Sequence, residues 1–160
     1  MGVVTRPTMD RARQAVFNAL ESLDEVNGAR VVDAYAGSGA MGIEALSRGA
    51  RSCTFIERDR DALVVLERNV VTLGLRERST IVRGDPIEVL AGCSDATLIL
   101  ADPPYEFREW ARLLALAPSA LVVAESNRAL TDEDPPLVGW STVRQRRYGR
   151  ATVSFLRRLA

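Results

Sequence analysis

Short apolar runs that alternate with helix-like segments constrain the fold of this chain more than any other feature. The runs cover residues 30–35, 54–56, 79–83, 97–100 and 120–124. Between the earlier runs lie segments whose apolar residues recur every three or four positions, which is the spacing of one helix face. Short apolar strands separated by amphipathic helices are typical of a parallel sheet buried on both faces. The sequence therefore predicts an α/β fold.

Three helices are expected, over residues 8–23, 40–47 and 59–73. Thr8 follows Pro7 and is a candidate N-cap for the first helix, whose apolar face would consist of Ala12, Val16, Leu20 and Leu23. Gly49 is suited to the C′ position that ends the second helix. The third helix would bury Leu63, Leu66 and Val70.

The end of the chain has a different pattern. Residues 141–158 contain two strand-like runs joined at Tyr148, Gly149 and Arg150, which predicts an antiparallel hairpin. Residues 132–136 form the one obvious loop cluster before it. Because no repeat or linker divides the chain, we expect residues 1–160 to form a single domain.

Composition excludes several classes of enzyme. The chain contains no histidine, and all 21 of its basic residues are arginine. Serine and cysteine triads, a P-loop lysine, Schiff-base chemistry and histidine-bound metals are therefore excluded, and we expect no metal. Cys53 and Cys93 lie far apart without a CxxC pattern, so we expect two small buried apolar residues.

Location can be predicted only from what the sequence lacks. No apolar run approaches the roughly 18 residues of a membrane span, and the N-terminus lacks the order of a signal peptide. We therefore expect a cytoplasmic protein without membrane contact. The net charge is zero, so any attraction for nucleic acid must come from local clusters.

A glycine-rich turn follows the first apolar run. Gly37, Gly39 and Gly42 match G-x-G-x-x-G at a place where backbone N–H groups and a helix N-terminus can hold an anion. Glu57 lies 20 residues after Gly37, as a ribose-binding acid does in dinucleotide sites. A plain strand-to-helix turn is the alternative that involves no ligand.

Asp33 distinguishes between two ligands for this turn. It ends the first run four residues before Gly37, where its carboxylate would repel a pyrophosphate but attract an ammonium or sulfonium group. S-adenosylmethionine carries both cations, together with a carboxylate for the helix end and a ribose for Glu57. We therefore expect S-adenosylmethionine rather than NAD, with a solubilising charge as the alternative role of Asp33.

The second motif is Asp102-Pro103-Pro104-Tyr105, directly after the fourth run. In an open α/β sheet this position faces the same crevice as the glycine turn. An exocyclic amino group on a base has two N–H donors: the Asp102 carboxylate can accept one and the Pro103 carbonyl the other, while Tyr105 stacks on the ring. The alternative is a strand-ending turn with Tyr105 packed in the core.

The chain resembles the RsmD-type 16S rRNA guanine-N2 methyltransferases of bacteria over nearly its whole length. The resemblance rests on R-P-T-M-D-R-A-R-Q, D-A-Y-A-G-S-G-A-M-G-I-E-A-L-S-R-G-A, F-I-E-R-D, G-D and D-P-P-Y. It implies a Rossmann-like class I methyltransferase with a seven-stranded, mostly parallel sheet ending in an antiparallel hairpin. It also implies methyl transfer from S-adenosylmethionine to the N2 amino group of one guanine in 16S rRNA, within an assembled 30S subunit. Separately, we expect the protein to be a monomer.

The resemblance also assigns residues. The target base would be held by the catalytic residues Asp102, Pro103, Pro104 and Tyr105. Cofactor contacts would come from the glycine turn and the two following strand ends, at Asp33, Ala36, Gly37, Ser38, Gly39, Gly42, Glu57, Arg58, Asp85 and Pro86. Asp33 and the turn would line the methionine end, Glu57 the ribose and Asp85 the adenine.

One feature departs from the resemblance. Family members usually carry a basic, glycine-containing hairpin before R-P-T, whereas here only residues 1–5 precede Arg6. We expect cofactor binding to survive without such an arm, and RNA affinity to be reduced, because phosphate contacts supply much of nucleic-acid binding.

Arginines are the candidate RNA contacts. As a set, the N-terminal segment and the final hairpin offer Arg6, Arg11, Arg144, Arg146 and Arg147. A single arginine on a helix face or hairpin edge is as often only a solvated charge.

Other functions stay open at this point. A methyltransferase of DNA amino groups would use the same D-P-P-Y chemistry, and the R-P-T segment disfavours it. A protein glutamine methyltransferase would more often have asparagine at the place of Asp102. A non-catalytic RNA-binding or ribosome-assembly module could retain the cofactor pocket, and an NAD-linked dehydrogenase is the remaining alternative.

Overall fold

The computed structural model describes residues 6–130 and 137–159, with side chains from residue 9 onward. The loop expected at residues 132–136 and the segment before Arg6 lie outside these ranges. No helix in the described ranges is long and apolar enough to cross a membrane.

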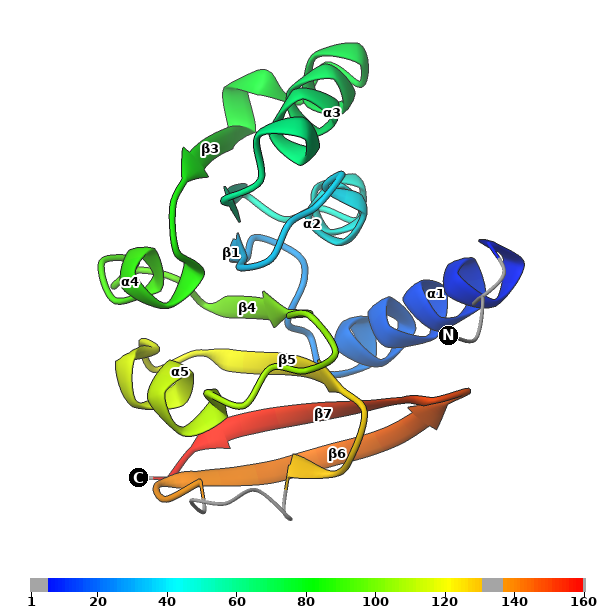
Figure 1. Cartoon of the computed structure of the whole chain (residues 1–160). Helices are drawn as coiled ribbons and strands as arrows, with labels where there is room; N and C mark the ends of the chain where they lie inside the picture. The colour runs from blue at the N-terminus through cyan, green and yellow to red at the C-terminus, as the bar shows by residue number, and fades with distance from the viewer. Residues whose placement is uncertain (1–5, 131–136, 160) are drawn as a thin grey trace.

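A seven-stranded sheet forms the centre of the described chain (Figure 1). Its spatial order is β3-β2-β1-β4-β5-β7-β6. The first five strands in the chain run parallel, and β7 is antiparallel to both β5 and β6. The strand bounds are β1 (Arg30–Asp33), β2 (Ser52–Glu57), β3 (Ser79–Arg83), β4 (Leu98–Ala101), β5 (Leu121–Ser126), β6 (Trp140–Tyr148) and β7 (Ala151–Arg158). The expected parallel sheet with a C-terminal hairpin is confirmed.

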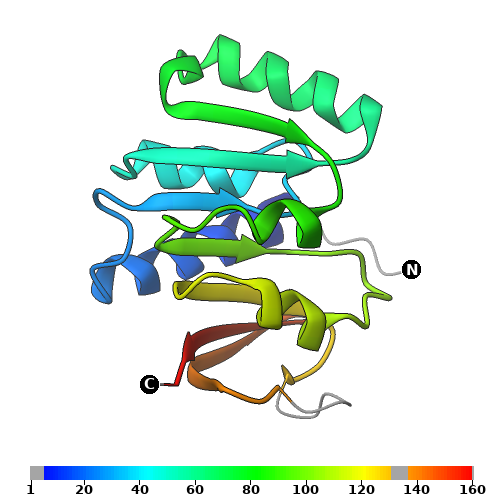
Figure 2. The ribbon, with the colours of Figure 1, turned by 90° about the vertical axis from the view of Figure 1, so that its left-hand side faces the viewer.

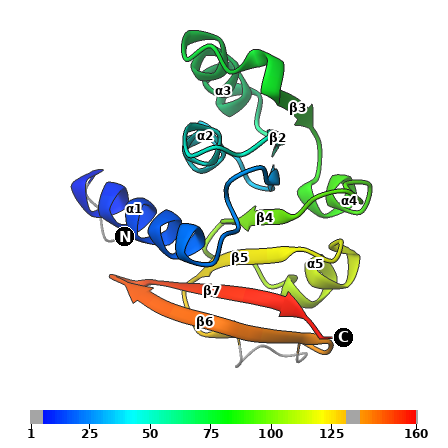
Figure 3. The ribbon, with the colours of Figure 1, turned by 180° about the vertical axis from the view of Figure 1, so that it is seen from behind.

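Helices cover both faces of the sheet (Figures 1 and 3). One face carries α1 (Arg6–Ser22), α2 (Ala40–Ser47) and α3 (Arg60–Thr72), and the other carries α4 (Pro86–Leu90) and α5 (Trp110–Leu116). A short 3-10 helix, η1 (Arg76–Arg78), leads into β3. Gly49 has a φ of 106° after α2, and its N–H bonds to the Leu46 carbonyl, which confirms the expected C′ glycine.

Two apolar layers follow from the alternation of side chains along each strand. Val31 and Phe55 face α1, α2 and α3, where they pack with Phe17 of α1. Val32 and Ile56 face the opposite way and pack with α4 and α5 around residues such as Trp110. Because the central strands are buried on both sides, their sequences read as continuous apolar runs.

Several expectations from sequence are wrong in detail. The first helix begins at Arg6, so Thr8 lies inside its first turn and is not the N-cap. Val16 and Leu20 of the expected apolar face are buried and Leu23 packs against the same core, as predicted, whereas Ala12 is only partly buried and the fully buried Phe17 was not expected on this face. Cys53 is buried as expected, but Cys93 is only partly buried because it lies in the turn after α4.

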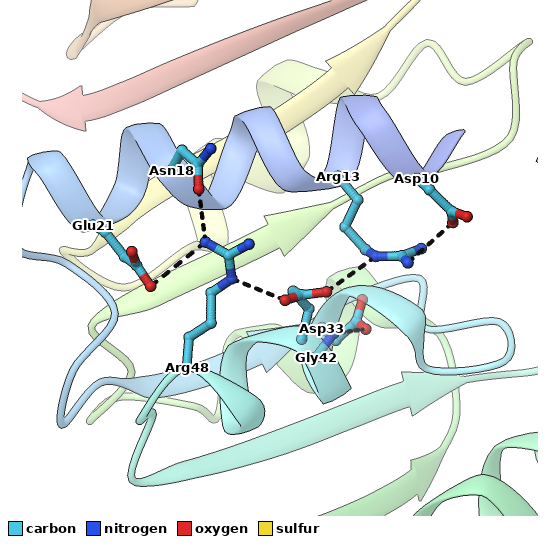
Figure 4. A network of polar contacts seen from close by, with 8 residues as sticks. Asp10, Arg13, Asn18, Glu21, Asp33, Gly42 and Arg48 are labelled. Atoms are coloured by element: carbon cyan, nitrogen blue, oxygen red, sulfur yellow. Dashed lines mark hydrogen bonds and ion pairs between the residues drawn. The ribbon is translucent and has the colours of Figure 1, made fainter. Parts of the chain in front are cut away.

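Polar side chains fix α1 against α2 (Figure 4). Arg13 of α1 bonds to Asp10 and to Glu44 of α2, and Arg48, directly after α2, bonds to Glu44, Glu21 and Asn18. Arg13 and Arg48 thereby share three carboxylates. The positive charge of each arginine is largely neutralised by these neighbours.

Candidate active site

Acidic residues collect at the carboxyl edge of the parallel strands. Asp33, Glu57 and Glu125 lie at the ends of β1, β2 and β5, Asp102 directly follows β4, and Asp85 follows β3 after one glycine. In Figure 2 the arrowheads of β1 to β4 point toward the same edge of the sheet. The described residues contain no group of three or more acidic or cysteine side chains that could hold a metal ion.

The structure brings the glycine turn and the D-P-P-Y loop together. Strands β1 and β4 are direct neighbours, with Asp33 in register with Leu100, and the Ala34 N–H donates to the Leu100 carbonyl at 2.9 Å. The two motifs therefore start from adjacent strands at the same edge, as the sequence predicted from strand order in open α/β sheets.

Each glycine of the turn has a separate structural reason. Gly37 has a φ of 56°, and no atom lies within 4 Å of the place that a Cβ would occupy, so the turn opens on free space. Gly39 has a φ of 91° at the N-cap of α2. A Cβ on Gly42 would lie 2.4 Å from the Phe55 ring and 2.7 Å from the Cys53 sulfur. Helix α2 can therefore approach the sheet closely only with glycine at this position.

Asp33 is buried beneath the N-terminus of α2. It is 3% exposed, and its Oδ2 accepts a hydrogen bond from the Gly42 N–H at 3.0 Å. Burial raises the pKa of Asp33 from 3.8 to about 7; the Gly42 bond opposes the rise and the charge of Glu57 adds to it. The alternative of a solubilising surface charge is wrong, because the carboxyl group is held inside the fold.

Glu57 connects the end of β2 to the glycine turn. Its Oε1 accepts from the Gly37 N–H at 2.9 Å, and its Oε2 accepts from the N–H groups of Arg58 and Asp59, each at 2.9 Å. A carboxylate has about four lone-pair sites, so these three bonds fix its position and leave capacity for a further donor.

The remaining predicted cofactor residues lie around the same edge. Asp85 is the N-cap of α4, where it accepts from the Ile87 N–H at 3.0 Å, and Pro86 is buried at the first position of that helix. Ala36 is buried in the glycine turn, whereas Ser38 and Arg58 are exposed. The Ser38 carbonyl accepts from the Asn69 side chain at 2.9 Å, which holds the turn against α3.

The D-P-P-Y loop follows β4 without regular secondary structure at Asp102, Pro103 and Pro104, and it turns at Tyr105. Pro103 is buried, and the Pro104 carbonyl accepts from the Phe107 N–H at 2.9 Å. Within the described chain no backbone donor bonds to the Pro103 carbonyl. Tyr105 is 59% exposed, so the alternative that it packs in the core is wrong.

Three aromatic rings join the two motifs. Tyr35 of the glycine turn meets Phe107 edge to face at a centroid distance of 5.7 Å, and Phe107 meets Trp110 of α5 at 5.1 Å. Such pairs contribute roughly 0.5–1.5 kcal/mol each beyond the apolar area that they bury. Sequence reasoning missed this contact, because three rings at unrelated spacings give no periodic signal.

Asp102 lies against a second carboxyl group that sequence reasoning also missed. Burial of the Asp102 carboxyl raises its pKa well above the usual range, and a hydrogen bond with Glu125 and the charges of Glu125 and Asp33 add to the rise. The residue as a whole still presents surface to solvent, which limits the effect of burial. Burial is thus the first cause of the raised pKa of Asp102, and the contact with Glu125 is the second.

A groove of about 570 Å³ lies between α1 and the tip of the β6–β7 hairpin. Its lining consists of residues 11, 12, 14, 15 and 18 of α1 and residues 147–149 of the hairpin, and it includes Arg11 and Arg147 but no acidic residue. The tip extends past the carboxyl end of β5, since Ser126 pairs with Thr152. The groove is therefore at the flank of the candidate active site.

The other arginines predicted to contact RNA are not among the described residues that line this groove. Arg144 and Arg146 pair in register with Phe155 and Val153, so they lie on the face of the hairpin that α1 also covers. The side chain of Arg6 lies outside the described part of the structure.

Comparisons with known proteins agree with this arrangement. The chain is 33% identical over 165 residues to ribosomal RNA small subunit methyltransferase D of Escherichia coli K12, a match that covers 97% of this chain and 80% of that protein. The solved structure of Escherichia coli yhhF superposes with a TM-score of 0.79 at 30% identity, covering 97% of this chain and 88% of that one.

A more distant structure shares the fold alone. It is an RNA methyltransferase of Salinibacter ruber in complex with S-adenosyl-L-homocysteine, with a TM-score of 0.68 at 20% identity over 99% of this chain and 94% of that one. The family described as Conserved hypothetical protein 95 matches residues 1–157. The chain therefore belongs to the Conserved hypothetical protein 95 family, the RsmD-type rRNA methyltransferases.

Proposed function

We propose that this enzyme transfers the methyl group of S-adenosylmethionine to the N2 amino group of one guanine in 16S rRNA. The observation that carries the proposal is the meeting of the glycine turn and the D-P-P-Y loop on adjacent strands of a chain from this family. One motif suits a cationic methyl donor, and the other suits an exocyclic amine.

The residues at the glycine turn fit S-adenosylmethionine. Open space lies beside Gly37, the Asp33 carboxyl is close enough to the turn to bond Gly42, and Glu57 is held with one lone-pair site to spare for a ribose hydroxyl. Ala36, Ser38 and Gly39 would complete the methionine end, and Arg58, Asp85 and Pro86 would lie toward the adenine. When bound, the cofactor supplies a methyl group on a positively charged sulfur.

The D-P-P-Y loop fits the amine. The Asp102 carboxyl and the Pro103 carbonyl would accept its two N–H bonds, which aims the nitrogen lone pair toward the turn. The exposed Tyr105 is free to stack on the base, and the buried Pro103 and the turn bond at Pro104 keep the loop in place.

Alignment supplies most of the rate in this proposal. Methyl transfer from a sulfonium to a neutral amine moves one positive charge without creating an ion pair, so there is little new charge to stabilise. Holding two reactants in line can contribute roughly 7–11 kcal/mol, which exceeds the few kcal/mol needed to unstack the guanine. Asp102 would orient the amine and stabilise the positive charge that develops on its nitrogen, which loses a proton after the transfer.

The groove beside α1 supports contact with the RNA backbone. Arg13 and Arg48 are occupied by carboxylates, whereas no ion pair of Arg11 or Arg147 is found among the described residues. Residues 141–151 contain four arginines and no acidic residue. We therefore assign RNA phosphates to Arg11 and Arg147, with Arg144 and Arg146 beside them and Arg6 at the helix start.

The assembled 30S subunit is the substrate form that we propose, with the enzyme acting as a monomer in the cytoplasm where ribosomes are made. The net charge of the protein is zero, so it could capture free RNA only through local clusters of charge. This supports a structured particle as the substrate.

Labelled methyl transfer tests the proposal directly. Unmethylated 30S particles, naked 16S rRNA and DNA are offered in parallel, and the product is digested to nucleosides. We expect N2-methylguanosine from the particle. Methylated DNA bases would instead support the DNA amino-methyltransferase. Absence of product in a single turnover, with S-adenosylhomocysteine still bound, would support the non-catalytic module, and NADH serves as the negative ligand control.

A further inference from the structure

We propose that Glu125 is a positioning residue for the transfer: its carboxyl group shares a proton with Asp102, holds the Asp102 oxygens in place for the amine, and provides a route for the released proton. This inference rests on the proposed function, and it concerns a residue outside both sequence motifs.

Strand geometry places the two groups side by side. Strands β4 and β5 are parallel neighbours with Ala101 in register with Ala124, so Asp102 and Glu125 occupy the next matched positions. Leu100 and Val123 face the layer under α1 and α2, whereas Ala101 and Ala124 face the other layer. By alternation, Asp102 and Glu125 both return to the α1 and α2 face, where their side chains are hydrogen-bonded.

A hydrogen bond between two carboxyl groups requires a proton. An ionised carboxylate only accepts, so one member of the pair must be protonated, and the pair carries a single negative charge. Pairs of this kind hold one proton tightly and take up a second only at lower pH. A donor amine that approaches Asp102 favours an ionised Asp102 oxygen, and the single proton then moves within the pair.

Further charged groups lie around the pair. Asp33 of β1 adds a negative charge near Asp102. On the other side, Glu125 pairs with Val153 of β7, and Val153 pairs with Arg146 of β6, so that guanidinium lies one strand further away on the same face. From α1, Arg13 is bonded to Asp10 and Glu44.

The proton balance of the transfer is complete with this pair. As the methyl group moves from sulfur to nitrogen, the C–S electron pair stays on sulfur and the nitrogen lone pair forms the N–C bond. The positively charged nitrogen then gives one N–H proton to the Asp102 oxygen, which forms an O–H bond. The pair, now doubly protonated, returns a proton to solvent through the exposed side of Asp102.

Two substitutions at one position separate the hydrogen bond from the titration. In Glu125→Gln the amide N–H still donates to Asp102, but the neighbouring acid is gone. In Glu125→Ala both are removed. The matched control is Glu77→Gln, an exposed glutamate at the opposite edge of the sheet. Single-turnover methyl transfer to the accepted RNA is measured against pH with saturating cofactor, together with the affinities for RNA and S-adenosylhomocysteine.

We expect Glu125→Ala to slow the transfer by on the order of 10- to 100-fold, because a misplaced catalytic oxygen has effects of this size, while both affinities change little. Glu125→Gln should recover most of the rate at high pH. Its acid limb should lie at lower pH than that of the wild type, because the pKa of Asp102 falls when the neighbouring acid is removed.

An infrared measurement gives a readout without turnover. In an Asp33→Asn background, which removes the carboxyl group whose pKa is about 7, the cofactor-free protein should show the carbonyl stretch of a protonated carboxylic acid at about pH 7. The band should disappear when Glu125→Gln is added. This measurement also serves if the alanine variant fails to fold.

Wild-type transfer rates in Glu125→Ala, or an unmoved acid limb in Glu125→Gln together with an unchanged infrared band, would overturn the inference. A wild-type enzyme that methylates no RNA would instead contradict the proposed function, so the two failures are distinguishable.

Discussion

Asp33 is a residue whose burial lowers stability. With a pKa near 7 in the folded protein and 3.8 in the unfolded chain, the protonated form is favoured by folding. The wild-type free energy of unfolding therefore falls as the pH rises from about 4 to 7, and above that it levels off. The fall amounts to roughly 1.4 kcal/mol per unit of pKa shift. An ionised carboxylate in this position would attract a cationic ligand. Without such a ligand, it lowers the free energy of unfolding.

Asp33→Asn should stabilise the cofactor-free protein above pH 7 and weaken its affinity for S-adenosylmethionine. The amide oxygen keeps the Gly42 bond, while the buried amide N–H groups offset part of the gain, so we expect a net increase of about 1–3 kcal/mol. Urea denaturation at several pH values measures the first effect and calorimetric titration the second. An identical pH dependence of stability in both proteins would contradict the buried charge.

Asp102→Ala should abolish turnover while leaving the affinity for S-adenosylhomocysteine within a few-fold of the wild type. The reason is that Asp102 belongs to the β4 loop, whereas the cofactor would lie on the β1 turn. Rapid-quench assays and calorimetry test the two parts of the prediction. Near wild-type methylation by this variant would show that another group orients the amine.

At the scale of elements, the approach of α2 to the sheet gives a matched pair of substitutions. Gly42→Ala forces a Cβ onto Phe55 and Cys53 and should destabilise the protein by roughly 1–3 kcal/mol, the usual effect of overpacking. Gly37→Ala meets no atom and should cost only the roughly 1–2 kcal/mol of a left-handed residue.

Urea denaturation without cofactor compares the two variants. A second measurement separates their causes: truncating the clashing sulfur with Cys53→Ala should partly relieve Gly42→Ala and have no such effect on Gly37→Ala. Equal behaviour of both variants with and without Cys53→Ala would contradict the packing explanation.

The elements that could be predicted are those with a long or strongly periodic signal. The runs at β1 to β5 and the helices α1 to α3 were expected because their apolar spacing extends over enough residues. Helices α4 and α5 were not expected, since five and seven residues are too short to show a helical period. The Asp85-Pro86 start of α4 was a usable capping signal that the cofactor interpretation of Asp85 obscured.

At the scale of the whole molecule, the predicted site follows from one topological rule. Carboxyl ends of parallel strands share an edge, so residues after β1 and β4 could be placed together without knowing their side-chain contacts. Glu125 and the Tyr35–Phe107–Trp110 contact could not, because they depend on strand register and loop conformation. Whether the predicted cofactor and RNA residues touch their ligands stays a prediction.

Charge distribution across the molecule leads to a prediction about RNA affinity. Arg11→Glu combined with Arg147→Glu should weaken RNA binding and lower the slope of log affinity against log salt by about 1 for each phosphate that is no longer neutralised. The matched control is Arg76→Glu, an exposed arginine at the amino edge of the sheet. Filter binding at several salt concentrations measures both, and equal slopes in all three proteins would remove the groove from the RNA interface.

The acidic edge has a consequence for what can enter the site. Five strand ends present carboxyl groups to the cofactor and base positions, while Arg11 and Arg147, for which no ion pair is found among the described residues, lie to one side at α1 and the hairpin tip. A nucleic acid that reaches this edge is attracted along its backbone to the flank and repelled from the centre. The uncharged base is the part of a nucleotide that can approach these carboxyl groups without electrostatic repulsion. The charge pattern therefore favours extrusion of the base from the nucleic acid, which the proposed methyl transfer requires.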